Sequence, residues 1–197
     1  MARTVDPARH AARRLGIVDA ALTCFARLGY DGATTAAICR EAAIGSGTFF
    51  HYFPTKADVL LAILELGTAE TREWFAAAAG RADARAVLAD HIDRAVAEAV
   101  DPRIAGFVRA VSAVLGDPRI AAALAEDERV LRDGLLPWMA RAQDAGQVRT
   151  DLLAERLTSW LMLLTDGFLG RIASEPAFTA AAEGDTLRDV AQRLLAP

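Results

Sequence analysis

The stretch GSGTFFHYFPTK at residues 45–56 gathers side chains that can bind nucleic acid. Hydroxyl, imidazole, phenol and ammonium groups can contact phosphate oxygens, and small polar side chains can enter the major groove of DNA and reach base edges. These groups belong to Ser46, Thr48, His51, Tyr52 and Lys56. Because no Arg, Asn or Gln occurs from Ser46 to Tyr52, two-pronged hydrogen bonding to a base is absent. A protein that used this stretch to read DNA would depend on hydroxyl and methyl contacts, on a basic N-terminal arm and on DNA shape.

Catalytic or metal-binding residues do not form any recognisable pattern. The three histidines, His10, His51 and His91, are far apart, and none stands at metal-ligand spacing from Cys24 or Cys39. The chain has no glycine-rich phosphate loop after a strand and no G-x-S-x-G sequence. We therefore expect a protein that is not an enzyme and that holds neither cofactor nor metal.

Composition and charge limit the class of protein further. The 197 residues are 53% hydrophobic, yet no run approaches the roughly 18 consecutive apolar residues that a membrane span needs. No apolar segment of a signal peptide follows the basic start of the chain. Residues 1–56 carry 7 Lys+Arg against 4 Asp+Glu, a net of +3, and residues 57–197 carry 15 against 22, a net of −7, which together give −4. We expect a cytoplasmic protein whose basic end and acidic body meet different partners.

Helices are the elements that must position the polar stretch. Helix-forming residues dominate, apolar residues recur every three or four positions, and no alternating strand pattern appears. Gly29 should end the first long helix, and Asp101 and Asp117, in two copies of DPRIA, should each cap a helix that starts with proline. The sequence thus predicts an all-α fold of about nine helices. Their expected bounds are 8–28, 35–42, 46–53, 55–79, 84–100, a start after Asp101, 119–146, 151–174 and 185–195.

The helices at 35–42 and 46–53, with the short connection between them, have the dimensions of a helix-turn-helix. Phe49 and Phe53 are four residues apart, so they share one helix face, which can pack on Ile38. The polar residues of the second helix then face outward. Small residues at its start let the backbone approach DNA closely, and a helix N-terminus favours a phosphate.

A family resemblance rests on these residues. GYDGATTAAICREAAIGSGTFFHYFPTK, at residues 29–56, resembles the DNA-binding module of the tetracycline-repressor-like (TetR) family, and IVDAALTCFARLGY resembles the family's first helix. The resemblance implies a homodimer with a helix-turn-helix DNA-binding domain at 1–54 and a ligand-binding and dimerisation domain at 55–197. It implies a transcriptional repressor that a small-molecule inducer releases from a palindromic operator. The alternative is a constitutive or architectural DNA-binding dimer without an inducer.

Carried over position by position, the resemblance assigns contacts to double-stranded DNA. Phosphates would be bound at the starts of the second and fourth helices, and base edges would be reached from the start of the third. The implied DNA-binding residues are Thr34, Thr35, Ser46, Gly47, Thr48, His51, Tyr52 and Lys56. The N-terminal arm would add Arg3, Arg9, Arg13 and Arg14.

Three residues depart from the family pattern. Ala43 replaces the usual glycine of the turn, so we expect a less relaxed backbone there. Gly45 replaces a serine N-cap, which should weaken the start of the recognition helix by a few tenths of a kcal/mol. Phe50 replaces a tyrosine and removes one hydroxyl that could bind phosphate.

Aromatic and soft residues at helical positions in the acidic part of the chain predict the walls of a ligand cavity. The set is Trp74, His91, Phe107, Trp138, Met139 and Trp160. Pro137 should kink or break the helix at 119–146 and open space beside it. Taken one at a time, each of these residues is more typical of ordinary core than of a pocket wall.

Small residues along one face of the helix at 151–174 predict a dimer interface, because they let another helix approach closely. The neighbouring bulky residues, which include Trp160, should point into their own subunit. Asp166, in an apolar stretch, belongs either to this interface, which we favour, or to a ligand site as a counter-charge. The alternative is that the small face packs within the monomer. The predicted interface is Ser159, Leu163, Gly167, Gly170, Ser174, Leu187, Val190 and Leu194.

Overall fold

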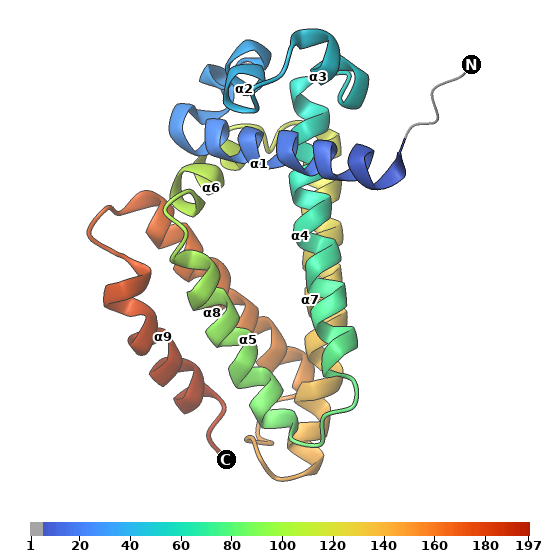
Figure 1. Ribbon diagram of the computed structural model, residues 1–197. Coiled ribbons are helices and arrows are strands. Elements are labelled where there is room, and N and C mark those ends of the chain that lie inside the picture. The colour runs from blue at the N-terminus through green and yellow to red at the C-terminus, as the bar shows by residue number, and fades with distance from the viewer. Residues whose placement is uncertain (1–5) are drawn as a thin grey trace.

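The computed structural model describes residues 6–197, and these residues form nine α-helices and no strand (Figure 1). The all-α prediction is therefore confirmed. The helices are α1 Pro7–Gly32, α2 Thr35–Glu41, α3 Ser46–Tyr52, α4 Lys56–Ala78, α5 Ala84–Ala99, α6 Ile104–Ser112, α7 Pro118–Asp144, α8 Ala154–Ser174 and α9 Ala180–Leu194. No helix in the described part of the chain combines the length and apolarity needed to cross a membrane.

Long helices form a scaffold that carries the two short helices α2 and α3 at one end. Figure 1 shows α4 and α7 side by side along their length, with α1 lying across one end of the pair. Helix α7 also packs on α5 and α8, and α9 packs on α5 at the edge of the molecule. Helices α2 and α3 therefore project from the end of the scaffold.

Two hydrophobic clusters hold this arrangement together. One joins α1, α2 and α3 to the first turns of α4 and to α6 and α7, through residues such as Phe25, Ile38, Phe49, Leu60 and Ala110. The other joins α5, α7, α8 and α9 and the end of α4. The first cluster extends past residue 54. It includes residues of α4, α6 and α7, so these helices pack with the N-terminal helices although they follow the predicted domain boundary.

Helices α1 and α6 pack so closely that no side chain fits between their backbones at one point. A Cβ atom added to Gly106 would lie 1.9 Å from the backbone oxygen of Ala26. Beside this contact, Arg103 donates to Asp19 at 2.7 Å and to Thr23 at 3.3 Å on α1. Glycine is thus required at position 106, and α6 is tightly coupled to α1.

The predicted helix starts and stops hold in part. Gly29 has a φ of 69° and a non-helical conformation that kinks α1, and the chain then makes one more turn to Gly32. Asp117 caps α7 ahead of Pro118, as predicted. The cap at Asp101 is wrong: its carboxylate accepts from the backbone and side chain of Arg103 in a turn, and α6 begins only at Ile104.

Two further predictions about helices need correction. Helix α9 begins five positions before residue 185, at Ala180, because the hydroxyl of Thr179 caps it by accepting from the backbone of Ala182 at 3.2 Å. Helix α7 is not broken at Pro137 but runs on to Asp144. Packing of α7 on α4, α5 and α8 holds the helix together across the proline.

Candidate nucleic-acid interface

The recognition helix α3 presents its polar face to solvent. Phe49 and Phe53 are 0% and 2% exposed and share a cluster with Ile38, so the predicted division of this helix into a core face and a free face is confirmed. The exposed side of α3 carries Ser46, Gly47, Thr48, Phe50 and His51. Hydroxyl and imidazole groups on a projecting helix can reach into a DNA groove.

The turn before α3 contains a strained residue. Ala43 has a φ of 50°, which lies in the left-handed region. Residues that carry a Cβ atom rarely adopt this conformation. Backbone bonds from Ala43 to Arg40 (3.2 Å) and from Ile44 to Cys39 (2.9 Å) hold it in place. Gly45 is the N-cap of α3 and makes no side-chain cap. Both departures from the family pattern therefore have the structural setting expected for them.

The start of α4 is anchored to the DNA-binding end of the molecule. The ammonium of Lys56 donates to the carbonyl of Tyr30 at 2.6 Å and lies 4.0 Å from the centre of its ring. Thr55 and Asp58 form a capping box, and Arg119 of α7 donates to Asp58 at 3.0 Å. Hydrogen bonds from Thr55, and then from Arg119, lower the pKa of the Asp58 carboxyl. Lys56 is thus fixed beside the face where the resemblance places a phosphate contact.

The first turns of α1 form a second wall beside the recognition helix. An open hollow of about 970 Å³ lies between them, and Arg9, Arg13 and Asp6 line it opposite residues 43–52. The ring of His10 packs on Tyr52 at 4.5 Å and lies 6.0 Å from that of His51. A concave, positively charged surface of this kind can hold a sugar-phosphate strand.

The other predicted DNA contacts lie at the edges of this surface. Thr34 caps α2 by accepting from the backbone of Ala37 at 3.1 Å, and half-buried Thr35 begins that helix. Arg14 lies 5.1 Å from the ring centre of Phe53. Arg3 is outside the described residues. Sequence reasoning missed His10, and the only available signal was its place between Arg9 and Arg13.

The six predicted cavity residues do not gather around one cavity. Trp138 and Met139 are buried in the second cluster, where half-buried Trp74 packs against it. Phe107 instead packs against the first cluster, and Trp160 is 46% exposed. No group of His, Cys, Asp and Glu within residues 6–197 could hold a metal ion.

One member of this set, His91, has an unusual environment. It is buried, its Nε2 has no hydrogen-bond partner among the described residues, and its ring lies 6.3 Å from that of Trp74. Burial, and then the nearby Arg94 cation, lower the pKa of His91 to about 4. A neutral imidazole nitrogen that has no partner in the interior can accept a hydrogen bond from a ligand or donate one to it.

The small-residue face of α8 is free in the monomer. Ser159, Leu163, Gly167, Gly170 and Ser174 are all exposed. A hollow of about 300 Å³ runs between this face and α9, and Leu163, Gly167 and Val190 are among its lining residues. Val190 is exposed, Leu194 is half-buried, and Leu187 is buried in its own subunit.

Two predictions around this face need correction or refinement. Trp160 does not point into its own subunit: it stands three residues before Leu163 and seven before Gly167, which places it on the same exposed face. Asp166 is exposed and stands three residues after Leu163 and four before Gly170, which places it on the same face, on the side towards Glu128 and Asp127 of α7. Partial burial, and then the carboxylates of Glu128 and Asp127, raise the pKa of its carboxyl.

Comparisons with known proteins agree with this geometry. The family model described as bacterial regulatory proteins, tetR family, matches residues 17–63. The HTH-type transcriptional repressor AcnR of Corynebacterium diphtheriae is 30% identical over 162 residues, which cover 82% of each chain.

Solved structures show the same fold. A TetR transcription regulator from Haloarcula marismortui matches with a TM-score of 0.82 at 20% identity, over 94% of this chain and 97% of that one. A transcriptional regulator from Saccharomonospora viridis, solved in complex with choline, matches with a TM-score of 0.77 at 20% identity, over 95% and 99%. This chain belongs to the TetR family of bacterial regulatory proteins, and it is a DNA-binding transcriptional regulator and not an enzyme.

Proposed function

We propose that the protein is a cytoplasmic repressor that binds a palindromic operator as a homodimer and leaves it when a small organic ligand binds residues 55–197. The observation that carries the DNA-binding part is the exposed polar face of α3 beside the basic first turns of α1. Residues 1–54, together with Lys56 at the start of α4, supply the contacts to DNA in this proposal. Two copies related by a twofold axis would place two α3 helices in successive major grooves.

The exposed face of α8 supports the homodimer. Glycine and serine along a helix leave room for a partner backbone, and the hollow between α8 and α9 offers apolar surface beside them. We propose that Ser159, Leu163, Gly167, Gly170 and Ser174 face the second copy, together with Val190 and the exposed part of Leu194. Leu187 would support this surface from beneath.

A partnerless buried nitrogen supports a ligand in the second part of the molecule. His91 Nε2, next to Trp74, can form a hydrogen bond only with a group that enters the interior. The relative from Saccharomonospora viridis binds choline in the same fold. A ligand between α5 and its neighbours could move α6, and the close contact of Gly106 with Ala26 would pass the movement to α1.

Selection of bound duplexes from a random DNA pool tests the operator. We expect a palindromic site, and we expect Thr48→Ala to change the preferred bases while the melting temperature stays the same. Thr71→Ala, on α4, is the matched control and should leave the site unchanged. A Thr48→Ala protein with the original site and a lower melting temperature would show that Thr48 is structural.

A thermal-shift screen with small organic ligands tests the inducer. A ligand that binds only the folded state must raise its melting temperature. We expect at least one such ligand to weaken operator binding, and we expect His91→Gln to reduce its effect. If no stabilising ligand changes the affinity for the operator, the protein is a constitutive regulator.

A further inference from the structure

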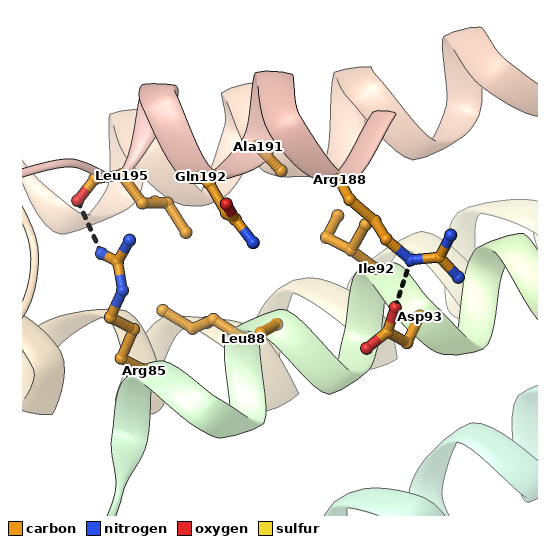
Figure 2. Close-up of a pocket in the computed structure, with 9 residues that line it drawn as sticks. Arg85, Leu88, Ile92, Asp93, Arg188, Ala191, Gln192 and Leu195 are labelled. Atoms are coloured by element: carbon orange, nitrogen blue, oxygen red, sulfur yellow. Dashed lines mark hydrogen bonds and ion pairs between the residues drawn. The ribbon is translucent and has the colours of Figure 1, made fainter. Parts of the chain in front are cut away.

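A crevice between α5 and α9 lies apart from both proposed sites. It has a volume of about 210 Å³, and none of the predicted cavity or DNA-binding residues lines it. Figure 2 shows Leu88 and Ile92 of α5 facing Ala191 of α9, with Arg85 at one end and Arg188 at the other. The crevice is thus an apolar slot with an arginine at each end, and Asp93 lines it beside Arg188.

Buried apolar side chains form the floor of the crevice. Leu88, Ile92, Ala191 and Leu195 are at most 4% exposed, so only a thin part of each side chain meets solvent. Gln192 of α9 is exposed and lies over the space between the two arginines (Figure 2). An apolar chain in the slot would cover this floor without unpairing a buried polar group.

The two arginines differ in how their charge is balanced. Arg188 donates from Nε to Asp93 at 2.6 Å and from Nη1 to Asp185 at 2.8 Å, so two carboxylates neutralise it. Half-buried Arg85 donates from Nη1 to the carbonyls of Gln147 at 2.8 Å and Leu195 at 3.0 Å. Within residues 6–197 no carboxylate pairs with Arg85.

Arg85 is therefore a cation held in place with no carboxylate partner among residues 6–197. Nη1 directs its hydrogens to the two carbonyls. The Nη2 and Nε hydrogens remain for an acceptor. Charge-assisted bonds from a guanidinium held in one orientation favour a planar carboxylate over a neutral group.

We propose that this crevice binds a small carboxylic acid with a short apolar chain. The carboxylate pairs with Arg85, and the chain lies on Leu88, Ile92 and Ala191. At about 30 Å³ for each water-sized group the slot has room for about seven such groups, and it is smaller than the pockets of about 300–1,000 Å³ that hold drug-sized ligands. The bound acid bridges α5 and α9. This proposal does not depend on the proposed inducer site.

Titration of the full chain with sodium hexanoate, followed by amide chemical shifts in NMR, tests the site. We expect saturable shifts confined to residues 85–93, 147 and 188–195. Hexan-1-ol, which has the same chain without the charge, should bind at least tenfold more weakly, and hexylammonium should not bind. Equal affinity for acid and alcohol, or shifts centred on Trp74 and His91, would overturn the proposal.

A blocking variant and its control make the test specific. Ala89 lines the crevice and is exposed on α5, so Ala89→Leu should fill the slot, leave the helix intact and abolish the hexanoate shifts. Ala97→Leu, at an exposed position of the same helix away from the slot, should bind hexanoate as the wild type does. Binding that survives Ala89→Leu would place the acid elsewhere.

Arg85→Lys tests the role of the guanidinium. It keeps the positive charge but loses the fork, so we expect at least tenfold weaker hexanoate binding. Unchanged affinity in a folded Arg85→Lys protein would contradict the pairing with Arg85.

Discussion

Ala43 keeps a left-handed backbone in the turn before the recognition helix, where a Cβ atom costs about 1–2 kcal/mol. We expect Ala43→Gly to raise the free energy of unfolding by about 0.5–1 kcal/mol, because the relief of strain exceeds the extra chain entropy of glycine. Urea unfolding measures this change. Ala42→Gly, at a neighbouring residue with a φ of −78°, should instead destabilise the protein. A loss of stability in both variants would show that the turn is unstrained.

His91 makes stability depend on pH. Its pKa is lowered from 6.5 to about 4, so between these pH values the unfolded chain binds a proton that the folded chain does not. The stabilisation is complete above about pH 6.5 and is lost as the pH falls towards 4. We expect the free energy of unfolding to fall by about 2 kcal/mol more between pH 7 and pH 5 in the wild type than in His91→Gln. Parallel pH profiles for the two proteins would place His91 in contact with water.

The burial or exposure of a residue could be predicted where it follows from spacing along a single helix. The division of α3 into buried Phe49 and Phe53 and exposed Thr48 follows from spacing along one helix. The contact between His10 and Tyr52 could not be predicted, because it joins residues far apart in the chain. Trp160 was predictable in principle, since its spacing from Leu163 and Gly167 already places it on their face.

Helices α1 and α6 are joined by the contact at Gly106, which has no room for a methyl group. We expect Gly106→Ala to destabilise the protein by about 1–3 kcal/mol through overpacking and to weaken operator binding, because α1 must shift. Gly67→Ala, on α4 with open space around it, should be neutral or slightly stabilising. Thermal unfolding and operator affinity of the two variants check this. Equal melting temperatures would mean that α6 slides on α1 without resistance.

Helix type was predictable from the apolar period, whereas several helix ends were not. Asp117 and Asp101 sit in the same five-residue sequence, yet only Asp117 caps a helix. Arg103 engages Asp101 and also binds Asp19 of α1, so tertiary contacts decide how the first copy is used. Thr179 caps α9 ahead of the start that the sequence predicted at residue 185.

Assembly of two copies depends on the exposed face of α8. A Cβ atom at Gly167 would meet nothing within 4 Å in the monomer, so Gly167→Leu should leave the fold intact. We expect it to separate the dimer and to weaken operator binding at least tenfold, as measured by sedimentation and by DNA titration. Gly67→Leu is the control, because its site on α4 is equally open. A dimeric Gly167→Leu protein that binds DNA tightly would place the interface on another face.

The packing of the helices into two hydrophobic clusters explains why the predicted cavity residues do not surround one cavity. Phe107 and Trp138 look alike in sequence, since both are aromatic residues within helices. Their helices nevertheless join different clusters, because α6 packs under α1 while this part of α7 packs on α5. Which cluster a helix joins depends on how the helices cross one another. Residue spacing within one helix does not reveal this crossing.

Lys56 is the only lysine in the sequence, and its amine is held against the carbonyl and ring of Tyr30. An amine-directed reagent therefore has one side-chain target in the whole protein, and that target sits at the start of α4, where the DNA-binding end meets the scaffold. While the amine stays bonded to Tyr30, its acylation should be slow. The rate of Lys56 acylation, measured by mass spectrometry, therefore reports how often the start of α4 is released from Tyr30. No label has to be introduced into the protein.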